Sequence, residues 1–149
     1  TVEEAVSGAD IVCTVTSSRE PVVHGAWLAP GTHVNAVGSS VATSRELDSA
    51  AVAKARLFVD HRESALAEAG DFLLARAEGA VDDAHILGNL GELVTQQIPG
   101  RQSPTEITLF KSVGLAIEDV AAAQHIYSKA RGSGFGKLVE FGGGRHDAD

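Results

Sequence analysis

The chain has 149 residues, of which 44% are hydrophobic and 21% are charged, as in a globular domain with a core of its own. Its formal net charge of −8 argues against a surface for nucleic acid or an anionic membrane. No apolar run approaches the roughly 20 residues that span a bilayer. We therefore expect a cytoplasmic protein that binds neither nucleic acid nor membrane.

The first part of the chain predicts the end of a helix followed by two strands. Residues 1–8 have the spacing of an amphipathic helix. Residues 10–16 and 32–37 are continuous apolar runs with β-branched side chains, the pattern of strands buried on both faces of a parallel sheet. The single cysteine, Cys13, lies in the first run, so we expect a buried thiol without a nucleophilic role.

Helices and strands alternate along the rest of the chain. The pattern predicts a helix over 45–55, a strand over 56–60, a helix over 64–78, a short helix after Gly88 within 82–94, a loop over 99–104, a strand over 106–110 and a helix over 114–131. Strands separated by helices or long crossovers are typical of an α/β fold with a parallel sheet.

Small polar residues follow the first two predicted strands. Ser17 and Ser18 end the first strand, and Gly38, Ser39 and Ser40 follow the second. In open α/β sheets, ligands bind beyond the carboxyl ends of the strands. Ordinary turn chemistry explains the same residues, so the pattern alone leaves both interpretations open.

Residues 105–119 form a third such place, because an apolar strand ends at Lys111 and Ser112, and Gly114 opens a helix. Free N–H groups at a helix N-terminus favour an anion or a polar ligand. No predicted strand is followed by a G-x-G-x-x-G loop or a P-loop. If this is a dinucleotide-binding domain, its phosphate-binding half is therefore not in the chain.

Two features of the composition narrow the function further. The six histidines have no spacing typical of metal ligands, so we expect no metal site. The chain contains no methionine and begins within a helical pattern. We therefore expect a piece of a longer protein or a trimmed chain.

Four blocks of sequence carry a resemblance to a known family. They are residues 9–17 (Ala-Asp-Ile-Val-Cys-Thr-Val-Thr-Ser), 31–39 together with 45–48 (Arg-Glu-Leu-Asp), 91–94 together with 99–101, and 108–119. In this order and spacing they resemble the C-terminal half of the ornithine cyclodeaminase/μ-crystallin family, over roughly residues 2–131.

The resemblance implies the second half of a Rossmann-type NAD(P)-binding domain over 1–104. It implies a returning strand and helix of a substrate and dimerisation domain over 105–131. The glycine-rich sequence that follows indicates a flexible tail over 132–149. Family members exchange hydride at the α-carbon of an amino acid or imine. The implied ligands are therefore NAD or NADP and a small amino acid or imine, and the implied assembly is a homodimer.

The family's functional positions fall after three of the predicted strands. Val113 matches a residue that lines the substrate pocket, and Ser112 matches a serine that contacts the nicotinamide. Lys111 matches a variable position, so we expect its ammonium group at the surface or facing a phosphate. The implied cofactor contacts are Thr14, Thr16, Ser17, Ala36, Val37, Gly38, Ser39 and Ser112.

Ser40 departs from the family pattern at the catalytic position. Ornithine cyclodeaminases carry an aspartate there that handles the substrate amine and proton transfer. A hydroxyl cannot act as a base near neutral pH without an activating partner. We therefore favour an amino-acid dehydrogenase or ketimine reductase. The alternatives are ornithine cyclodeaminase proper (L-ornithine to L-proline and ammonia) and a non-catalytic NADPH- or ligand-binding protein like μ-crystallin.

The isolated chain is expected to be inactive, because half a Rossmann sheet lacks the pyrophosphate loop. The last predicted helix has a small apolar face formed by Ala116, Val120, Ala123 and Tyr127. Packing in the core and a surface at or near the dimer interface both explain this face.

Overall fold

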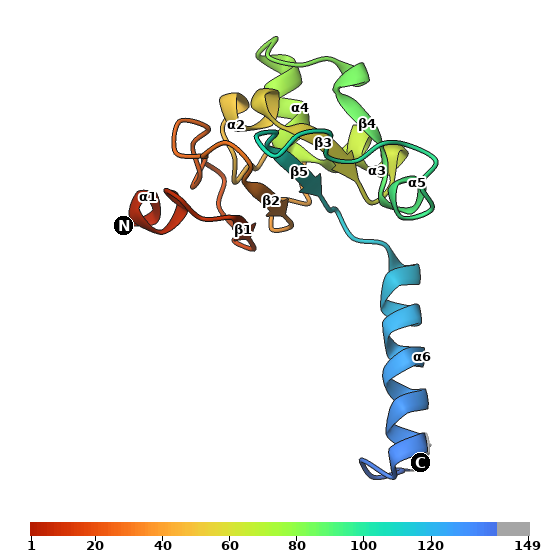
Figure 1. The fold of residues 1–149 in the computed structure, drawn as a ribbon. Helices are drawn as coiled ribbons and strands as arrows, with labels where there is room; N and C mark the ends of the chain where they lie inside the picture. Colours follow the sequence, from red (N-terminus) through yellow and green to blue (C-terminus); the bar gives the residue numbers. More distant parts are fainter. Residues whose placement is uncertain (140–149) are drawn as a thin grey trace, which may run out of the picture. The chain divides into compact units, whose positions relative to one another are not determined.

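The structure is a computed structural model and describes residues 1–139. The chain divides into a compact unit of residues 1–115 and a second unit that begins at Ala116. The first unit is a five-stranded sheet with helices beside it (Figure 1). Its strands are β1 (Ile11–Thr14), β2 (His33–Ala36), β3 (Arg56–Val59), β4 (Ile86–Asn89) and β5 (Thr108–Lys111).

All four strand pairings are parallel, and the strand order is β1-β2-β5-β3-β4. The predicted α/β class with a parallel sheet is therefore confirmed. The last strand in the sequence, β5, lies in the middle of the sheet between β2 and β3. The compact unit therefore extends to Leu115, whereas the sequence predicts a boundary at 104/105.

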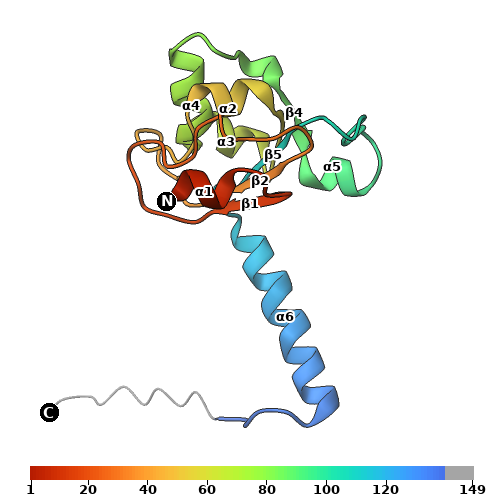
Figure 2. The ribbon, with the colours of Figure 1, turned by 60° about the vertical axis from the view of Figure 1, so that its left-hand side comes forward.

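Helices accompany the strands of the first unit. Figures 1 and 2 show α2, α3 and α4 together on one side of the sheet, and α1 beside β1. The bounds are α1 (Val2–Val6), α2 (Ser49–Lys54), α3 (Arg62–Glu68), α4 (Gly70–Ala77), the 3-10 turn η1 (Asp83–His85) and α5 (Leu90–Val94). No helix within residues 1–139 is long and apolar enough to cross a membrane.

The core lies on the sheet face that α2 and α4 cover. Register pairs Val12 with Val34, Val34 with Leu109, and Leu109 with Leu57, so these side chains form one buried row across four strands. Phe72 of α4 is buried in the same cluster. Full burial of one such side chain contributes about 1.5–3 kcal/mol, so this row is the main apolar support of the sheet.

The opposite face of β1 is open, and the prediction of a strand buried on both faces is wrong there. Ile11 is 65% exposed, and Cys13 is exposed as well. Side chains alternate along a strand, so Ile11 and Cys13 point to the same face of the sheet. Strand β1 stands at the edge of the sheet, and nothing in the described residues covers this face of it. An edge strand and a central strand have similar apolar runs, so the sequence does not separate them.

Cys13 is consequently expected to react with Ellman's reagent in the folded chain. Its thiol is exposed, and its one described polar neighbour is the Asn35 Nδ2 group, 3.7 Å from Sγ. We expect the colour change at a rate close to that of a small free thiol, with Cys13→Ser giving none. Reaction only after unfolding in urea would contradict the exposed position.

Two predicted helices are shorter in the structure than their patterns indicate. The helix predicted over 45–55 begins at Ser49, because Asp48 caps it by accepting a hydrogen bond from the Ala51 N–H at 2.8 Å. The helix predicted over 64–78 divides into α3 and α4 at Ala69, whose ψ angle is 88°. A Cβ atom at Gly70 would lie 1.9 Å from the Ser44 carbonyl oxygen, so the backbones of α4 and the loop before α2 touch there.

Strand β4 is absent from the sequence prediction, which expects a short helix after Gly88 within 82–94. That helix is present as α5, but η1 and β4 precede it. Gly88 weakens any strand pattern, yet it lies inside β4, where a Cβ atom would be 2.4 Å from Ile98 Cδ1. Pairing with β3 and this close contact determine the local structure, and neither is visible in the local sequence.

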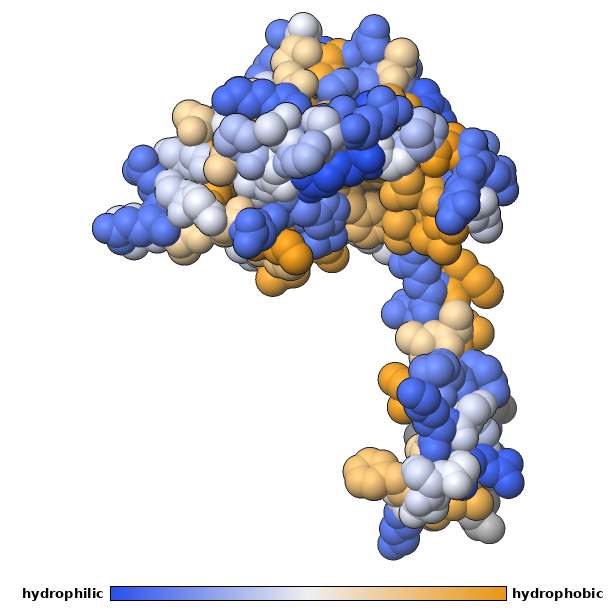
Figure 3. All heavy atoms as spheres, viewed as in Figure 1, coloured by the Kyte–Doolittle hydropathy of each residue, from blue (hydrophilic) through white to orange (hydrophobic). Residues whose placement is uncertain are grey.

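The second unit is helix α6 (Ala116–Ser133) and the residues after it. None of its side chains is buried, and Val120 and Tyr127 of the predicted apolar face are 61% and 49% exposed. Apolar side chains recur along α6 in Figure 3. Packing of this face in a core is therefore not seen within residues 1–139. Of the predicted tail over 132–149, residues 132–133 are helical and residues 140–149 lie outside the described residues.

Candidate functional site

The predicted site residues come together where the parallel strands end. Thr14, Ala36 and Lys111 are in register, and Val59 pairs with Lys111 on the far side. The segments that follow β1, β2, β5 and β3 therefore leave the sheet at one edge. In an open α/β sheet this is the edge at which ligands bind.

A buried glutamate joins the ends of β1 and β2. Glu46 is 0% exposed. Its Oε2 accepts hydrogen bonds from Thr14 Oγ1 and from the Gly38 N–H, both at 2.8 Å, and its Oε1 accepts one from the Thr16 N–H at 2.5 Å. Bonds to a charged acceptor are stronger than neutral ones. We call this arrangement the Glu46 clamp: Glu46, Thr14, Thr16 and Gly38.

Sequence reasoning missed Glu46, although it lies in the Arg-Glu-Leu-Asp block that carries the family resemblance. A glutamate before a helix is ordinary at the surface. Its burial depends on contacts with residues 8 to 32 positions away, which no local pattern reports. The only available signal was its membership of that block.

Gly38 has a steric role in the clamp. A Cβ atom at this position would lie 2.2 Å from the Thr16 carbonyl oxygen and 2.4 Å from Glu46 Oε1. Contacts below 3.0 Å are not tolerated by backbone atoms without movement. Only glycine therefore lets the loop after β2 reach the loop after β1.

A buried ion pair holds the segment that carries Glu46. Lys111 Nζ lies 3.1 Å from Asp71 Oδ2, and both side chains are 1% exposed. Asp71 Oδ1 accepts hydrogen bonds from the N–H groups of Glu46 at 2.7 Å and Leu47 at 2.8 Å. Lys111 Nζ also donates to the Ala36 carbonyl oxygen at 3.2 Å. The pair thus connects β5, β2 and the segment that carries Glu46.

The expectation of a surface or phosphate-facing Lys111 is therefore wrong. Its position in β5 is in register with Ala36 and Val59 on the face covered by helices. The ammonium group is neutralised internally by Asp71. A lysine at the end of an apolar strand usually reaches solvent, so the sequence pattern favoured the opposite placement.

Asp60 organises the turn that follows β5. Its Oδ2 accepts hydrogen bonds from Ser112 Oγ at 2.9 Å and from the N–H groups of Val113 and Gly114, both at 2.8 Å. Its Oδ1 accepts one from the His61 N–H at 2.8 Å. The sequence predicts an anion or polar ligand at this turn, and in the structure the carboxylate of Asp60 takes these N–H groups.

The predicted contact residues divide into inward-facing and outward-facing side chains. Ser39 is 2% exposed, and its hydroxyl donates to the Ser44 carbonyl oxygen. Ala36 and Ser112 are buried as well, and Val113 is half-buried. The exposed members are Thr16, Ser17, Val37 and Ser40. Contact of any of these residues with a cofactor or substrate stays a prediction.

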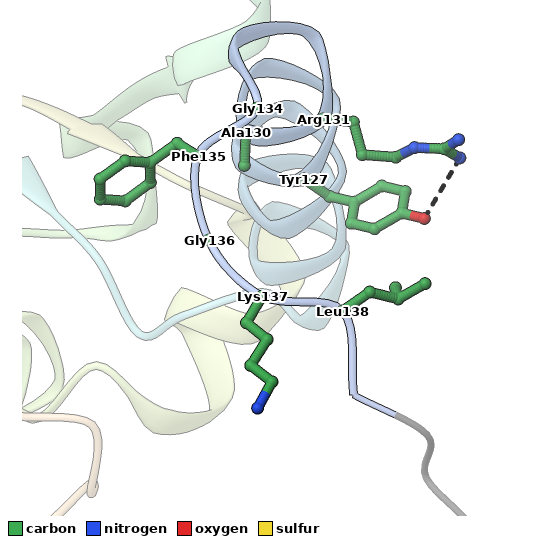
Figure 4. A pocket seen from close by; sticks show the side chains of 8 residues that line it. All are labelled: Tyr127, Ala130, Arg131, Gly134, Phe135, Gly136, Lys137 and Leu138. Carbon is green, nitrogen blue, oxygen red and sulfur yellow. Dashed lines mark hydrogen bonds between the residues drawn. The ribbon is translucent and has the colours of Figure 1, made fainter.

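Two hollows on the surface differ in their relation to these residues. A groove of about 540 Å³ runs along β1 beside α1, and Thr14 and Thr16 contribute to its lining. A second hollow of about 420 Å³ is formed where the chain reverses after α6 (Figure 4). Tyr127, Arg131 and Phe135 line it, and no predicted site residue does. Of these two hollows, the β1 groove is the one that belongs to the candidate site.

A parallel sheet whose strand-end loops meet at one edge, flanked by helices, is typical of half of a Rossmann-type α/β domain. The sequence profile described as "Ornithine cyclodeaminase/mu-crystallin family" matches residues 1–134. The chain belongs to this family.

Two relatives illustrate the similarity in sequence. The chain is 45% identical over 126 residues to "Ketimine reductase mu-crystallin" of Mus musculus, covering 85% of this chain and 37% of the relative. It is 46% identical over 122 residues to "Delta(1)-pyrroline-2-carboxylate reductase" of Paracoccus denitrificans (strain Pd 1222), covering 82% and 39%. The chain thus spans about two fifths of the length of these relatives.

Two solved structures are similar in fold and sequence. Delta(1)-pyrroline-2-carboxylate reductase of Thermococcus litoralis, in complex with NADH and L-proline, has a TM-score of 0.84 and 47% identity, covering 92% of this chain and 42% of that one. An archaeal alanine dehydrogenase dimer with bound NAD has a TM-score of 0.81 and 37% identity, covering 95% and 43%.

Proposed function

We propose that a protein carrying this chain is an NAD(P)-dependent ketimine reductase or amino-acid dehydrogenase. The chain would supply the nicotinamide side of the cofactor site. The observation that supports this most directly is the convergence of the segments after β1, β2 and β5 at one edge, held together by the buried carboxylates of Glu46 and Asp60. Relatives over 40% identical are named ketimine reductase and Delta(1)-pyrroline-2-carboxylate reductase.

In this proposal the chain's residues bind and orient, and the cofactor supplies the hydride. The exposed Thr16 and Ser17 after β1 and Val37 after β2 are the candidates for contact with the dinucleotide. Ser40 is exposed, and its neutral hydroxyl group is not a base that could accept a proton near neutral pH. The proton for the imine or amine would come from water or from a residue outside this chain, which agrees with a reductase more than with a cyclodeaminase.

We further propose a homodimer in which helix α6 belongs to the substrate and dimerisation domain. The support is its exposed apolar side chains and the dimer described for the archaeal alanine dehydrogenase. The apolar side chains of α6 have no buried surface in the described part of the chain, as expected of residues that a second copy would cover. A cytoplasmic location stays a prediction.

The test uses a protein in which this chain is extended to the length of its relatives. Oxidation of NADH and NADPH is measured with Delta(1)-pyrroline-2-carboxylate, with α-keto acids plus ammonia, and in reverse with amino acids. We expect turnover with an imine. Release of ammonia from L-ornithine would favour the cyclodeaminase, saturable dinucleotide binding without turnover would favour a binding protein, and no binding at all would contradict the proposal.

A further inference from the structure

We infer that Glu46 is a positioning residue, which holds the two strand-end loops in the arrangement that receives the cofactor. This inference rests on the proposed function in one respect, the identity of the ligand. The clamp itself is a property of the chain, so the two can fail separately.

The contacts of Glu46 converge from two separate parts of the chain. Thr14 and Thr16 belong to the end of β1 and its loop, and Gly38 belongs to the loop after β2. All three donate to one carboxylate that has no exposed surface. The Val37 and Gly38 N–H groups also donate to the Thr14 carbonyl oxygen, at 2.9 and 3.2 Å. Glu46 therefore adds a second connection between the loops, and it is the one that reaches Thr16.

The clamp needs a carboxylate and not merely a side chain of that size. A carboxylate offers acceptors on both oxygens, whereas an amide has one oxygen and one NH₂ donor. In Glu46→Gln, either the Thr16 N–H or the Gly38 N–H would face that donor. The Gly38 N–H would keep its bond to the Thr14 carbonyl oxygen at 3.2 Å. The Thr16 N–H would lose the acceptor that the structure gives it.

Glu46 is itself held in position before any ligand arrives. Its own N–H donates to Asp71 Oδ1 at 2.7 Å, and Asp71 is paired with Lys111. The Asp71 carboxylate thus fixes the backbone of Glu46, and the carboxylate of Glu46 in turn binds the two loops. A site prepared in this way avoids the ordering cost that a mobile loop adds to binding.

The first measurement is hydrogen exchange at the amides of Thr16 and Gly38 in the whole chain without ligand. We expect the Thr16 amide to exchange faster in Glu46→Gln, by about tenfold or more, because Glu46 is its acceptor. The Gly38 amide keeps its bond to the Thr14 carbonyl oxygen and should change less, and the amide of Val59 in β3 should change little. The matched control is Thr32→Val, which removes a buried hydroxyl bond to the Ala9 carbonyl oxygen (3.1 Å) before the amino end of β2.

The second measurement is dinucleotide affinity in the protein extended to the length of its relatives. Glu46→Gln is expected to weaken NADH binding about 10- to 100-fold, whereas Thr32→Val should change it about twofold at most. Equal losses in the two variants, matching their losses in thermal stability, would mean that Glu46 acts only through stability and would overturn the inference.

Two further outcomes are informative. If Glu46→Gln does not fold, Thr14→Val takes its place, because it removes one donor and keeps the carboxylate. Unchanged exchange at Gly38 together with unchanged NADH affinity in Thr14→Val would then count against the clamp. If the unaltered protein binds no dinucleotide, the proposed function fails. Hydrogen exchange at Thr16 and Gly38 still decides whether Glu46 holds the loops.

Discussion

Lys111→Met is expected to lower the free energy of unfolding by about 3–5 kcal/mol, because it leaves the buried carboxylate of Asp71 without its counter-charge. The two groups lie 3.1 Å apart, and both side chains are 1% exposed. Small domains are stabilised by only about 5–15 kcal/mol in total. Urea denaturation of the unaltered chain and the variant measures the difference directly.

The double variant Lys111→Met/Asp71→Asn is the matched control. Asparagine keeps an oxygen for the N–H groups of Glu46 and Leu47, which Asp71 Oδ1 accepts at present, and it removes the unpaired charge. We therefore expect the double variant to recover a substantial part of the loss. A Lys111→Met variant as stable as the unaltered chain would mean that the ammonium group does not neutralise Asp71.

Gly38→Ala is expected to destabilise the chain by about 1–3 kcal/mol and to open the site. The added methyl group would lie 2.2 Å from the Thr16 carbonyl oxygen, so the two loops must move apart and the bonds to Glu46 must lengthen. The extended protein should lose NADH affinity in parallel. Thermal unfolding and cofactor titration measure the two effects.

Gly91→Ala provides the comparison for this substitution. Gly91 lies in helix α5, and nothing stands within 4 Å of a Cβ atom there. Alanine favours helices over glycine by about 0.5–1 kcal/mol, so this variant should be as stable as the unaltered chain or slightly more stable. A Gly38→Ala variant that behaved like Gly91→Ala would contradict the close approach of the loops.

The four strands that the sequence predicts correctly have apolar runs with clear ends: small polar residues follow β1, β2 and β5, and Asp60 follows β3. Runs such as residues 10–16 and 32–37 are long enough and sufficiently β-branched to exclude a helix. The missed strand, β4, contains Gly88 and an exposed Leu87. Its conformation comes from its neighbour β3, and pairing between distant segments leaves little mark on a short run.

The position of the candidate site could be predicted from the sequence, but the hydrogen bonds that hold it together could not. Parallel strands bring their carboxyl ends to one edge, so Thr14, Gly38 and Ser112 could be assigned to one site. The charged residues behind them could not. Glu46, Asp60 and Asp71 look like ordinary surface carboxylates in the sequence, and only the fold reveals that each accepts backbone N–H groups in the interior.

The hydrogen bond between Ser112 and Asp60 restricts which ligand atoms can bond to the Ser112 hydroxyl oxygen. A hydroxyl group has one proton, and Ser112 donates its proton to Asp60 Oδ2. The Gly114 N–H occupies part of the remaining acceptor capacity of Ser112 Oγ at 3.2 Å. Any ligand atom that meets this oxygen must therefore bring a hydrogen of its own. A primary amide satisfies that demand, and an ionised carboxylate in the same position does not.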